Sequence, residues 1–159
     1  MRKLAMLTVV LFLCAPAVPV AAEVQSPQPP PLESYAVVVN ASNPSKETGD
    51  AAKKTVKALF LKELTRWADG VEAKPYDRGA KAPEHTAFLQ DVLGMSPAEL
   101  ARHWLRMKNM SGVTPPMDVD TDRILLRHVE RHDGAFGVVK ASAAKVPGVR
   151  VLFEFKAAR

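Results

Sequence analysis

Cysteine is almost absent from this chain: Cys14 is the only one among 159 residues. It lies in an apolar N-terminal stretch that we interpret below as a signal peptide. Leu13, directly before it, is not the small residue that a lipoprotein signal requires. We therefore expect the mature chain to have no thiol. This excludes disulfide bonds, cysteine-based metal sites and cysteine nucleophiles, so the fold must rely on its hydrophobic core.

Several functional motifs are also missing. The sequence has no internal repeat, no glycine-rich nucleotide-binding loop and no Ser–His–Asp arrangement at a supporting spacing. No carboxylate or further histidine accompanies His128 and His132 at the spacing of metal ligands. We therefore expect no catalytic residue, no metal and no cofactor, and an enzyme is the least favoured class of function.

The composition is that of an ordinary globular protein. Apolar residues make up 47% and charged residues 25%, and a length of 159 residues predicts one folded domain. The formal charge is +5, but the basic residues are spread along the chain without a run of five. This spread disfavours a nucleic-acid partner.

The N-terminus has the features of a secretory signal peptide over residues 1–22. Arg2 and Lys3 precede a short apolar run, and small residues precede an expected cleavage site between Ala22 and Glu23. The apolar run is too short to span a membrane. Cleavage would lower the formal charge from +5 to +3. Export of a chain without cysteine fits a bacterial periplasm, with no membrane insertion after the signal peptide is removed.

A proline-rich stretch separates the signal peptide from the folded part. Residues 23–33 are dominated by proline and polar residues, which predicts a stiff, extended linker. We therefore expect the folded domain to span residues 34–159.

Hydrophobic patterns in the folded part predict about four strands interleaved with four helices, which indicates an α/β domain with helices packed on the sheet. Ser96, Pro97 and Glu99 form a capping box that marks one helix start. Asp50 is the expected N-cap of an earlier helix. The expected elements are strands at Tyr35 to Val39, up to Tyr76, at Ala135 to Val139 and at Val149 to Phe155, and helices at Ala51 to Leu61, from Pro83, from Pro97 and at Asp122 to Arg131.

The same patterns predict which side chains are buried. Trp67 is expected to anchor the core with its indole N–H satisfied. In the last strand, alternation places Val149, Val151, Phe153 and Phe155 on one face. The remaining residues expected to face the core are Val37, Val39, Ala52, Val56, Leu59, Phe60, Phe88, Leu89, Val92, Leu93, Leu100, Ala101, Trp104, Leu105, Ile124, Leu125, Val129 and Phe136.

A polar loop between a strand and a helix is the candidate binding site. We expect the strand to end near Tyr76 and the loop to carry Asp77, Arg78 and Lys81, with Pro83 at the first helical position. A helix N-terminus facing a polar loop can bind an anion, and Arg78 adds a fork of donors. The alternative is an ordinary connection with a solvated arginine.

A second cationic feature lies on the last predicted helix. Arg123, Arg127 and Arg131 repeat every four residues and form a basic stripe near His128 and His132. This stripe could bind an acidic partner, or it could be a solvated helix face.

Five motifs in order resemble the phosphate-type substrate-binding proteins of ABC transporters, which have the type 2 periplasmic binding protein fold. They are V-V-V-N-A-S-N-P, A-L-F-L-K-E-L-T-R-W-A-D-G, Arg78 ten residues before Phe88, D-V-L-G-M-S-P-A-E-L and D-G-A-F-G-V-V. The resemblance covers Ala36 to Phe155. Whole proteins of this family have two lobes, whereas this domain resembles the second lobe alone.

The resemblance also implies the position of an oxyanion site, and this chain departs from it. The family's loop has Arg, three residues, and then Ser-Gly-Thr at the helix start. With Arg78 aligned, the last three positions are Ala82, Pro83 and Glu84. Alanine lacks the hydroxyl and proline the N–H, and glutamate places a negative charge near a bound anion. The residues expected to bind a ligand are Arg78, with Lys81 and His85 as partial substitutes for the missing groups.

These features predict a periplasmic substrate-binding-like protein of the phosphate ABC transporter type that binds a small oxyanion weakly if at all. The alternative is a ligand-free periplasmic interaction or sensor-accessory module. The expected partners are accordingly a small oxyanion and a membrane transporter or sensor protein.

Overall fold

The structure of the protein is a computed structural model that describes residues 32–158. The expected signal peptide and most of the expected linker lie outside the described residues. The first strand begins at Leu32, two residues before the expected start of the folded domain. Among residues 32–158, no helix combines the length and the apolar character needed to cross a membrane.

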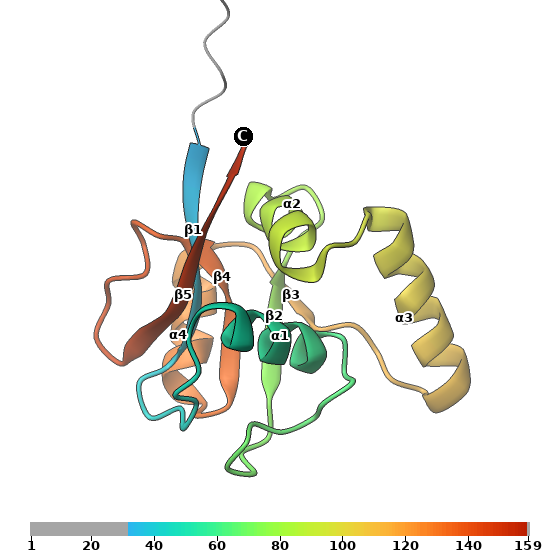
Figure 1. Cartoon of the computed structure of the whole chain (residues 1–159), viewed down its shortest axis with the longest axis horizontal. Coiled ribbons are helices and arrows are strands. Elements are labelled where there is room, and N and C mark those ends of the chain that lie inside the picture. The colour runs from blue at the N-terminus through green and yellow to red at the C-terminus, as the bar shows by residue number, and fades with distance from the viewer. Residues whose placement is uncertain (1–31, 159) are drawn as a thin grey trace, which may run out of the picture.

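Strands and helices alternate along most of the described chain (Figure 1). The five strands of this part are β1 (Leu32–Asn40), β2 (Lys74–Arg78), β3 (Met117–Val119), β4 (Ala135–Lys140) and β5 (Val149–Ala158). The helices are α1 (Gly49–Phe60), α2 (Pro83–Phe88), the π-helical segment η1 (Leu89–Leu93), α3 (Pro97–Ser111) and α4 (Asp122–Arg131).

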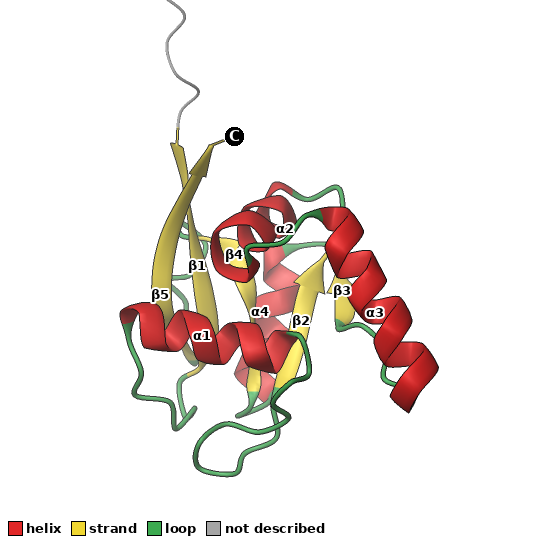
Figure 2. Ribbon diagram, turned by 45° about the vertical axis from the view of Figure 1, so that its right-hand side comes forward, coloured by secondary structure: helices red, strands yellow, loops and turns green. Residues whose placement is uncertain are grey.

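The five strands form one mixed sheet in the order β3-β2-β4-β1-β5. Strand β2 pairs in parallel with β3 and β4, whereas β1 pairs antiparallel with β4 and β5. The α/β class expected from the sequence is therefore confirmed. Because β1 and β5 pair from Leu32↔Ala158 onward, the two ends of the described chain lie side by side (Figure 2).

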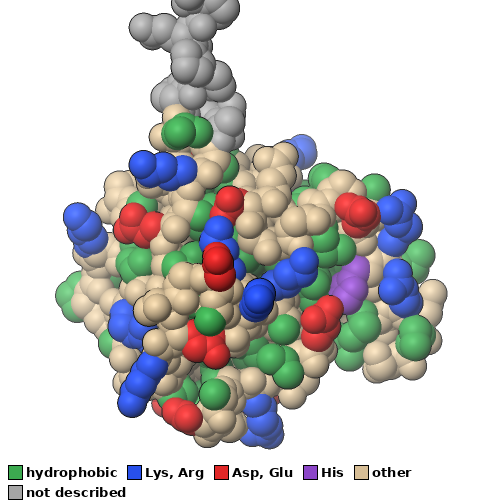
Figure 3. Space-filling view, in the orientation of Figure 1, with side chains coloured by type: hydrophobic (Ala, Val, Ile, Leu, Met, Phe, Trp, Pro, Cys, Tyr) green, Lys and Arg blue, Asp and Glu red, His purple; other side chains and the backbone are tan. Residues whose placement is uncertain are grey.

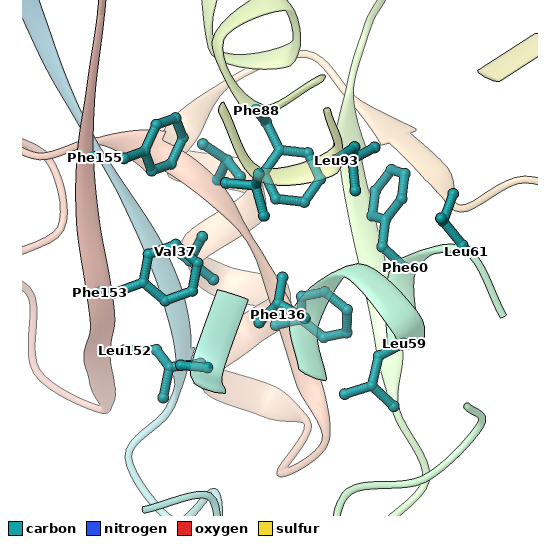
Figure 4. Packing of buried hydrophobic residues seen from close by; sticks show 14 of the residues in the cluster. Val37, Leu59, Phe60, Leu61, Phe88, Leu93, Phe136, Leu152, Phe153 and Phe155 are labelled. Carbon is teal, nitrogen blue, oxygen red and sulfur yellow. The ribbon is translucent and has the colours of Figure 1, made fainter. Parts of the chain in front are cut away.

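Two hydrophobic clusters pack on opposite faces of the sheet. Helices α1, α2, η1 and α3 contribute to the larger cluster, together with alternate residues of β1 and β4. Phe60 lies edge-on to Phe88, with ring centroids 5.0 Å apart, and Val37 and Phe136 lie in the same cluster (Figure 4). Helix α4 covers the other face through Leu125, Leu126 and Val129.

Most of the residues expected in the core are buried. Trp67 is 2% exposed, and its Nε1 donates to the Gly134 carbonyl at 3.0 Å, as expected of an anchoring tryptophan. Gly134 also lies close to the backbone of Glu72, where only glycine fits, because a Cβ at this position would lie 1.8 Å from the Glu72 carbonyl oxygen. The other confirmed core residues are Val37, Val39, Ala52, Val56, Leu59, Phe60, Phe88, Leu89, Val92, Leu93, Leu100, Trp104, Leu125, Val129 and Phe136.

Helix termini follow the sequence signals in most places. Ser96 and Glu99 form the expected capping box at the start of α3, and Pro83 is the first residue of α2. Gly94 ends η1 in a left-handed conformation with φ of 62°. The expected N-cap at Asp50 is wrong: α1 begins at Gly49 after Thr48, and no side chain caps it.

The strand expected to end near Tyr76 continues through Asp77 to Arg78. These two residues pair with Asp118 and Val119 of β3, a three-residue strand that the sequence did not predict. The parallel pairing with β3 supplies hydrogen bonds that the local sequence does not reveal. Asp77 and Arg78 therefore project from a strand rather than from a loop.

The last strand does not place its four expected residues on one face. The register slips between Val37↔Phe153 and Val38↔Val151, which leaves Leu152 as the extra residue of a β-bulge. As a result Phe153 and Phe155 face the larger cluster, whereas Val149 and Val151 pack against the α4 side. Leu152, expected on the opposite face from the phenylalanines, joins them in the larger cluster.

Two helices bury different sets of residues from those that the sequence predicts. Helix α3 buries only Leu100 and Trp104 and stands at one side of the molecule, so Ala101 is exposed and Leu105 is 61% exposed (Figure 1). In α4, Leu126 is buried in place of Ile124, which is 42% exposed. Helix α3 packs on α1 rather than on the sheet, since Trp104 lies edge-on to Phe60 with ring centroids 6.3 Å apart. In α4, the strip that faces the sheet contains Leu126 but not Ile124.

Candidate functional site

The candidate site lies at the carboxyl end of β2, where α2 and α4 both begin. Successive side chains of a strand point to opposite faces. Arg78 follows Tyr76 onto the α4 side of the sheet, whereas Asp77 points to the α2 side. Parallel strands β2 and β3 end at the same edge, and the chain enters α4 directly after β3. This topology brings the N-terminus of α4 to Arg78.

Arg78 is buried and lies beside carboxylates of the same chain. Arg78 as a whole is 7% exposed. Its Nη2 lies 3.6 Å from Oδ1 of Asp122, the first residue of α4. Glu84, which stands in the position of the family's threonine, is 3% exposed. Burial raises the pKa of Asp122; Arg78 opposes this increase, and the charge of nearby Glu84 adds to it.

The guanidinium nevertheless retains unused hydrogen-bond donors. Within residues 32–158, Nε and Nη1 of Arg78 are buried without a hydrogen-bond partner, and so is Oδ1 of Asp122. At 3.6 Å, the contact between Arg78 and Asp122 is an ion pair too long for a good hydrogen bond. Asp122 thus balances the charge of Arg78 but leaves Nε and Nη1 of the guanidinium without hydrogen-bond acceptors.

His85 lies on the other side of β2 from the Arg78 side chain. Its Nδ1 lies 2.9 and 3.0 Å from the two carboxylate oxygens of Asp77. This hydrogen bond raises the pKa of His85, while partial burial opposes the increase. Asp118, opposite Asp77 on β3, also has a raised pKa, because it is partly buried and lies near the negative Asp77.

The three sequence-predicted ligand residues therefore lie in different settings. Arg78 is buried against Asp122, His85 is bonded to Asp77, and Lys81 is exposed to solvent. For Lys81 we find no ion pair among the residues that the structure describes. The structure does not bring the three cationic side chains together around one position.

Sequence reasoning missed Asp122 as a member of the site. Asp122 lies more than forty residues from Arg78 in the chain, and only the parallel order of β2 and β3 brings them together. An aspartate at the first position of a helix is a common stabiliser of the helix dipole, so its type and place gave no functional signal. Within residues 32–158, no group of three or more potential ligand side chains could hold a metal ion.

No protein-family model matches the chain, and no curated protein matches it. Solved structures do match. A phosphate ABC transport receptor from Vibrio cholerae has a TM-score of 0.57 at 17% identity, over 76% of this chain and 46% of that one. A proposed phosphate ABC transporter substrate-binding protein from Clostridium perfringens, solved with bound phosphate, has a TM-score of 0.56 at 16% identity, over 76% and 44%.

A third match is a proposed phosphate-binding protein from Planctomyces limnophilus, with a TM-score of 0.54 at 12% identity, over 78% of this chain and 42% of that one. At these identities the likeness concerns the fold. The chain spans less than half the length of these proteins. The fold expected from the motifs, one part of the periplasmic binding protein fold, is therefore confirmed.

Proposed function

We propose that this domain is a periplasmic substrate-binding-like protein of the phosphate ABC transporter type that binds a small oxyanion weakly if at all. The observation that carries the proposal is the pairing of buried Arg78 with Asp122 at 3.6 Å, with Glu84 buried nearby. When both carboxylates are ionised, they outnumber the single buried guanidinium. Lys140 also acts on Asp122, but its side chain is 41% exposed and its Nζ lies 3.7 Å from a carboxylate oxygen of Glu33. A phosphate at this position would therefore meet a net negative charge.

Electrostatic repulsion between these carboxylates and a phosphate is large enough to prevent tight binding. Two like unit charges about 5 Å apart repel by roughly 3 kcal/mol at an effective dielectric constant of about 20. The unused Nε and Nη1 donors of Arg78 offset part of this repulsion through charge-assisted hydrogen bonds. Pro83 contributes no N–H at the start of α2. Together these groups account for weak or absent binding.

The alternative is a ligand-free interaction or sensor-accessory module in the periplasm. The internal pairing of Arg78 with Asp122 favours it, because the chain itself supplies the counter-charge that a ligand would otherwise bring. Its partner would be a membrane transporter or sensor protein. We propose no enzymatic role, since the matching solved structures are those of a transport receptor and of proposed binding proteins.

Isothermal titration calorimetry with inorganic phosphate tests the proposal. The native mature domain should bind phosphate with a Kd above about 1 mM, the value that corresponds to a binding free energy of roughly −4 kcal/mol. Glu84→Gln combined with Asp122→Asn should strengthen binding at least about tenfold. A control with two exposed carboxylates removed, Glu63→Gln and Glu154→Gln, makes the same change in total charge and should have little effect.

A second set of variants identifies the residue responsible. Added to the Glu84→Gln and Asp122→Asn double variant, Arg78→Ala should abolish any binding that the double variant gains. Restoring Ser-Gly-Thr at Ala82, Pro83 and Glu84 should add about 1 kcal/mol for each hydrogen bond regained. Tight phosphate binding by the native domain that survives Arg78→Ala would place the anion site elsewhere. If no variant binds any anion, the interaction module replaces the solute-binding function.

A further inference from the structure

Helix α4 carries a row of three arginines on its outer face. Arg123, Arg127 and Arg131, which we call the arginine ridge, are exposed and follow one another at intervals of four residues. Four residues of helix rise about 6 Å, so the three side chains lie one above another. Within residues 32–158, none of them forms an ion pair or a hydrogen bond with another side chain or the backbone.

This arrangement opposes the local stability of the helix. Like charges four residues apart repel each other along a helix surface. Arg123 also lies in the first turn, where the positive end of the helix dipole disfavours a cation. Neither effect is relieved by an acidic neighbour within ion-pair distance in the described part of the chain. A partner that brings negative charge would relieve both.

A groove runs beside the ridge. A cavity of about 290 Å³ lies between α4 and the turn before β5. Leu126, Val146 and Pro147 form its apolar part, and Arg123 and Arg127 line its charged part together with Glu130. Val146 is 37% exposed although it is apolar. The turn packs closely on α4, because a Cβ at Gly148 would lie 2.9 Å from Cγ of Glu130.

We propose that the arginine ridge and this groove together bind an acidic segment of a partner protein. Carboxylates of the segment pair with the guanidinium forks, which match carboxylate geometry, and one aliphatic side chain enters the apolar part of the groove. The inference rests on the interaction-module alternative above and names the chemistry of its partner. Helix α4 covers the face of the sheet opposite α1, so the ridge is separate from the larger core (Figure 1).

The combination of charge and groove favours a peptide over other anions. Free phosphate would use the arginines but not the apolar part of the groove. Nucleic acid would require a broader basic surface, whereas Glu130 interrupts this one. On the opposite, α1 side of the sheet, which Figure 3 shows, acidic and basic side chains are interspersed, so no basic surface continues there. An acidic, partly aliphatic peptide satisfies both parts of the surface.

Fluorescence anisotropy with a labelled probe peptide tests the inference. The probe is a 20-residue peptide with glutamate at every fourth position and leucine beside each glutamate, and its counterpart carries glutamine in place of glutamate. Arg123→Gln with Arg127→Gln should weaken probe binding at least tenfold without lowering the melting temperature. Arg102→Gln with Arg106→Gln on α3 is the matched control, since these arginines are also exposed and four residues apart, and it should change binding less than twofold.

Further arms separate the competing explanations. Val146→Asp places a negative charge in the groove. It should therefore weaken probe binding as much as Arg123→Gln with Arg127→Gln, which we call the ridge variant. Equal loss in the ridge and control variants, equal binding of the glutamine peptide, or no binding of the acidic peptide at 1 mM would each overturn the inference. Preferential binding to vesicles containing anionic lipid, lost in the ridge variant, would overturn it in favour of a membrane surface. The ridge variant should leave phosphate calorimetry unchanged, so the two proposals fail separately.

Discussion

Phe88 is one of the large side chains that fill the larger hydrophobic cluster. Phe88 is 3% exposed and packs edge-on against Phe60, with ring centroids 5.0 Å apart. Phe88→Ala should therefore lower the free energy of unfolding by about 3–5 kcal/mol, since it removes a large ring from a close-packed core. Denaturant melts measure this loss, with Leu105→Ala as the control, because Leu105 is 61% exposed. A loss under about 1 kcal/mol for Phe88→Ala would contradict the packing.

His85 makes the stability of the domain depend on pH. The hydrogen bond to Asp77 raises the pKa of His85 above its ordinary value of 6.5, so the folded state binds the proton more tightly than the unfolded state. The resulting stabilisation is fully present below pH 6.5 and is lost as the pH rises through the raised value in the folded protein. The free energy of unfolding should therefore decrease from pH 6 to pH 9 in the native protein.

Denaturant melts across this range check the direction of the change. The decrease should be smaller in His85→Gln, and His132→Gln serves as the matched histidine control. Burial raises the pKa of Asp118 and of Asp122, which produces a separate decrease starting near their ordinary value of 3.8. A His85→Gln variant with the full native decrease between pH 6 and pH 9 would rule out this role for the His85–Asp77 pair.

At the scale of elements, α3 is the helix with the least tertiary support. It buries only Leu100 and Trp104, so its stability depends on its own ends. The Glu99 N–H donates to Ser96 Oγ at 3.3 Å, and the Ser96 N–H donates to Glu99 Oε2 at 2.7 Å. Ser96→Ala should destabilise the helix by about 1 kcal/mol.

Amide hydrogen exchange is the appropriate measurement for this helix, because local opening reports the loss more directly than a global melt. Exchange should accelerate several-fold in α3 and remain unchanged in β1 and β4. Ser111→Ala, at the opposite end of α3, is the control variant. Acceleration spread over the whole domain would show that α3 is coupled to the core more tightly than its packing indicates.

The elements also show what a single sequence can reveal. The β-branched run at Tyr35 to Val39 and the capping box at Ser96 predicted a strand and a helix start because their signals are local. The three residues of β3 and the bulge at Leu152 were missed, since both depend on a neighbouring strand. In the candidate site, Arg78 could be singled out from the sequence, whereas its pairing with Asp122 required the strand order.

For the whole molecule, export is the prediction with the clearest readout. The N-terminal sequence predicts cleavage between Ala22 and Glu23, and mass spectrometry of protein from the periplasmic fraction should therefore find an N-terminus at Glu23. Ala22→Arg should block processing at this position, while the substitution Lys54→Arg in the folded domain should leave it intact. A retained, lipid-modified Cys14 would contradict the prediction and make the protein membrane-anchored.

The pairing of β1 with β5 has a mechanical consequence. Leu32 and Ala158 are direct partners in an antiparallel ladder, so a force that separates the two ends of the described domain acts on the hydrogen bonds one pair at a time. A ladder loaded in this way opens like a zipper, at lower force than one pulled along its strands, where the bonds share the load. The register slip beside Val37 and Val38 interrupts the ladder partway along. Tension between the ends would therefore release β5 from the sheet first and expose the phenylalanines that it contributes to the larger cluster.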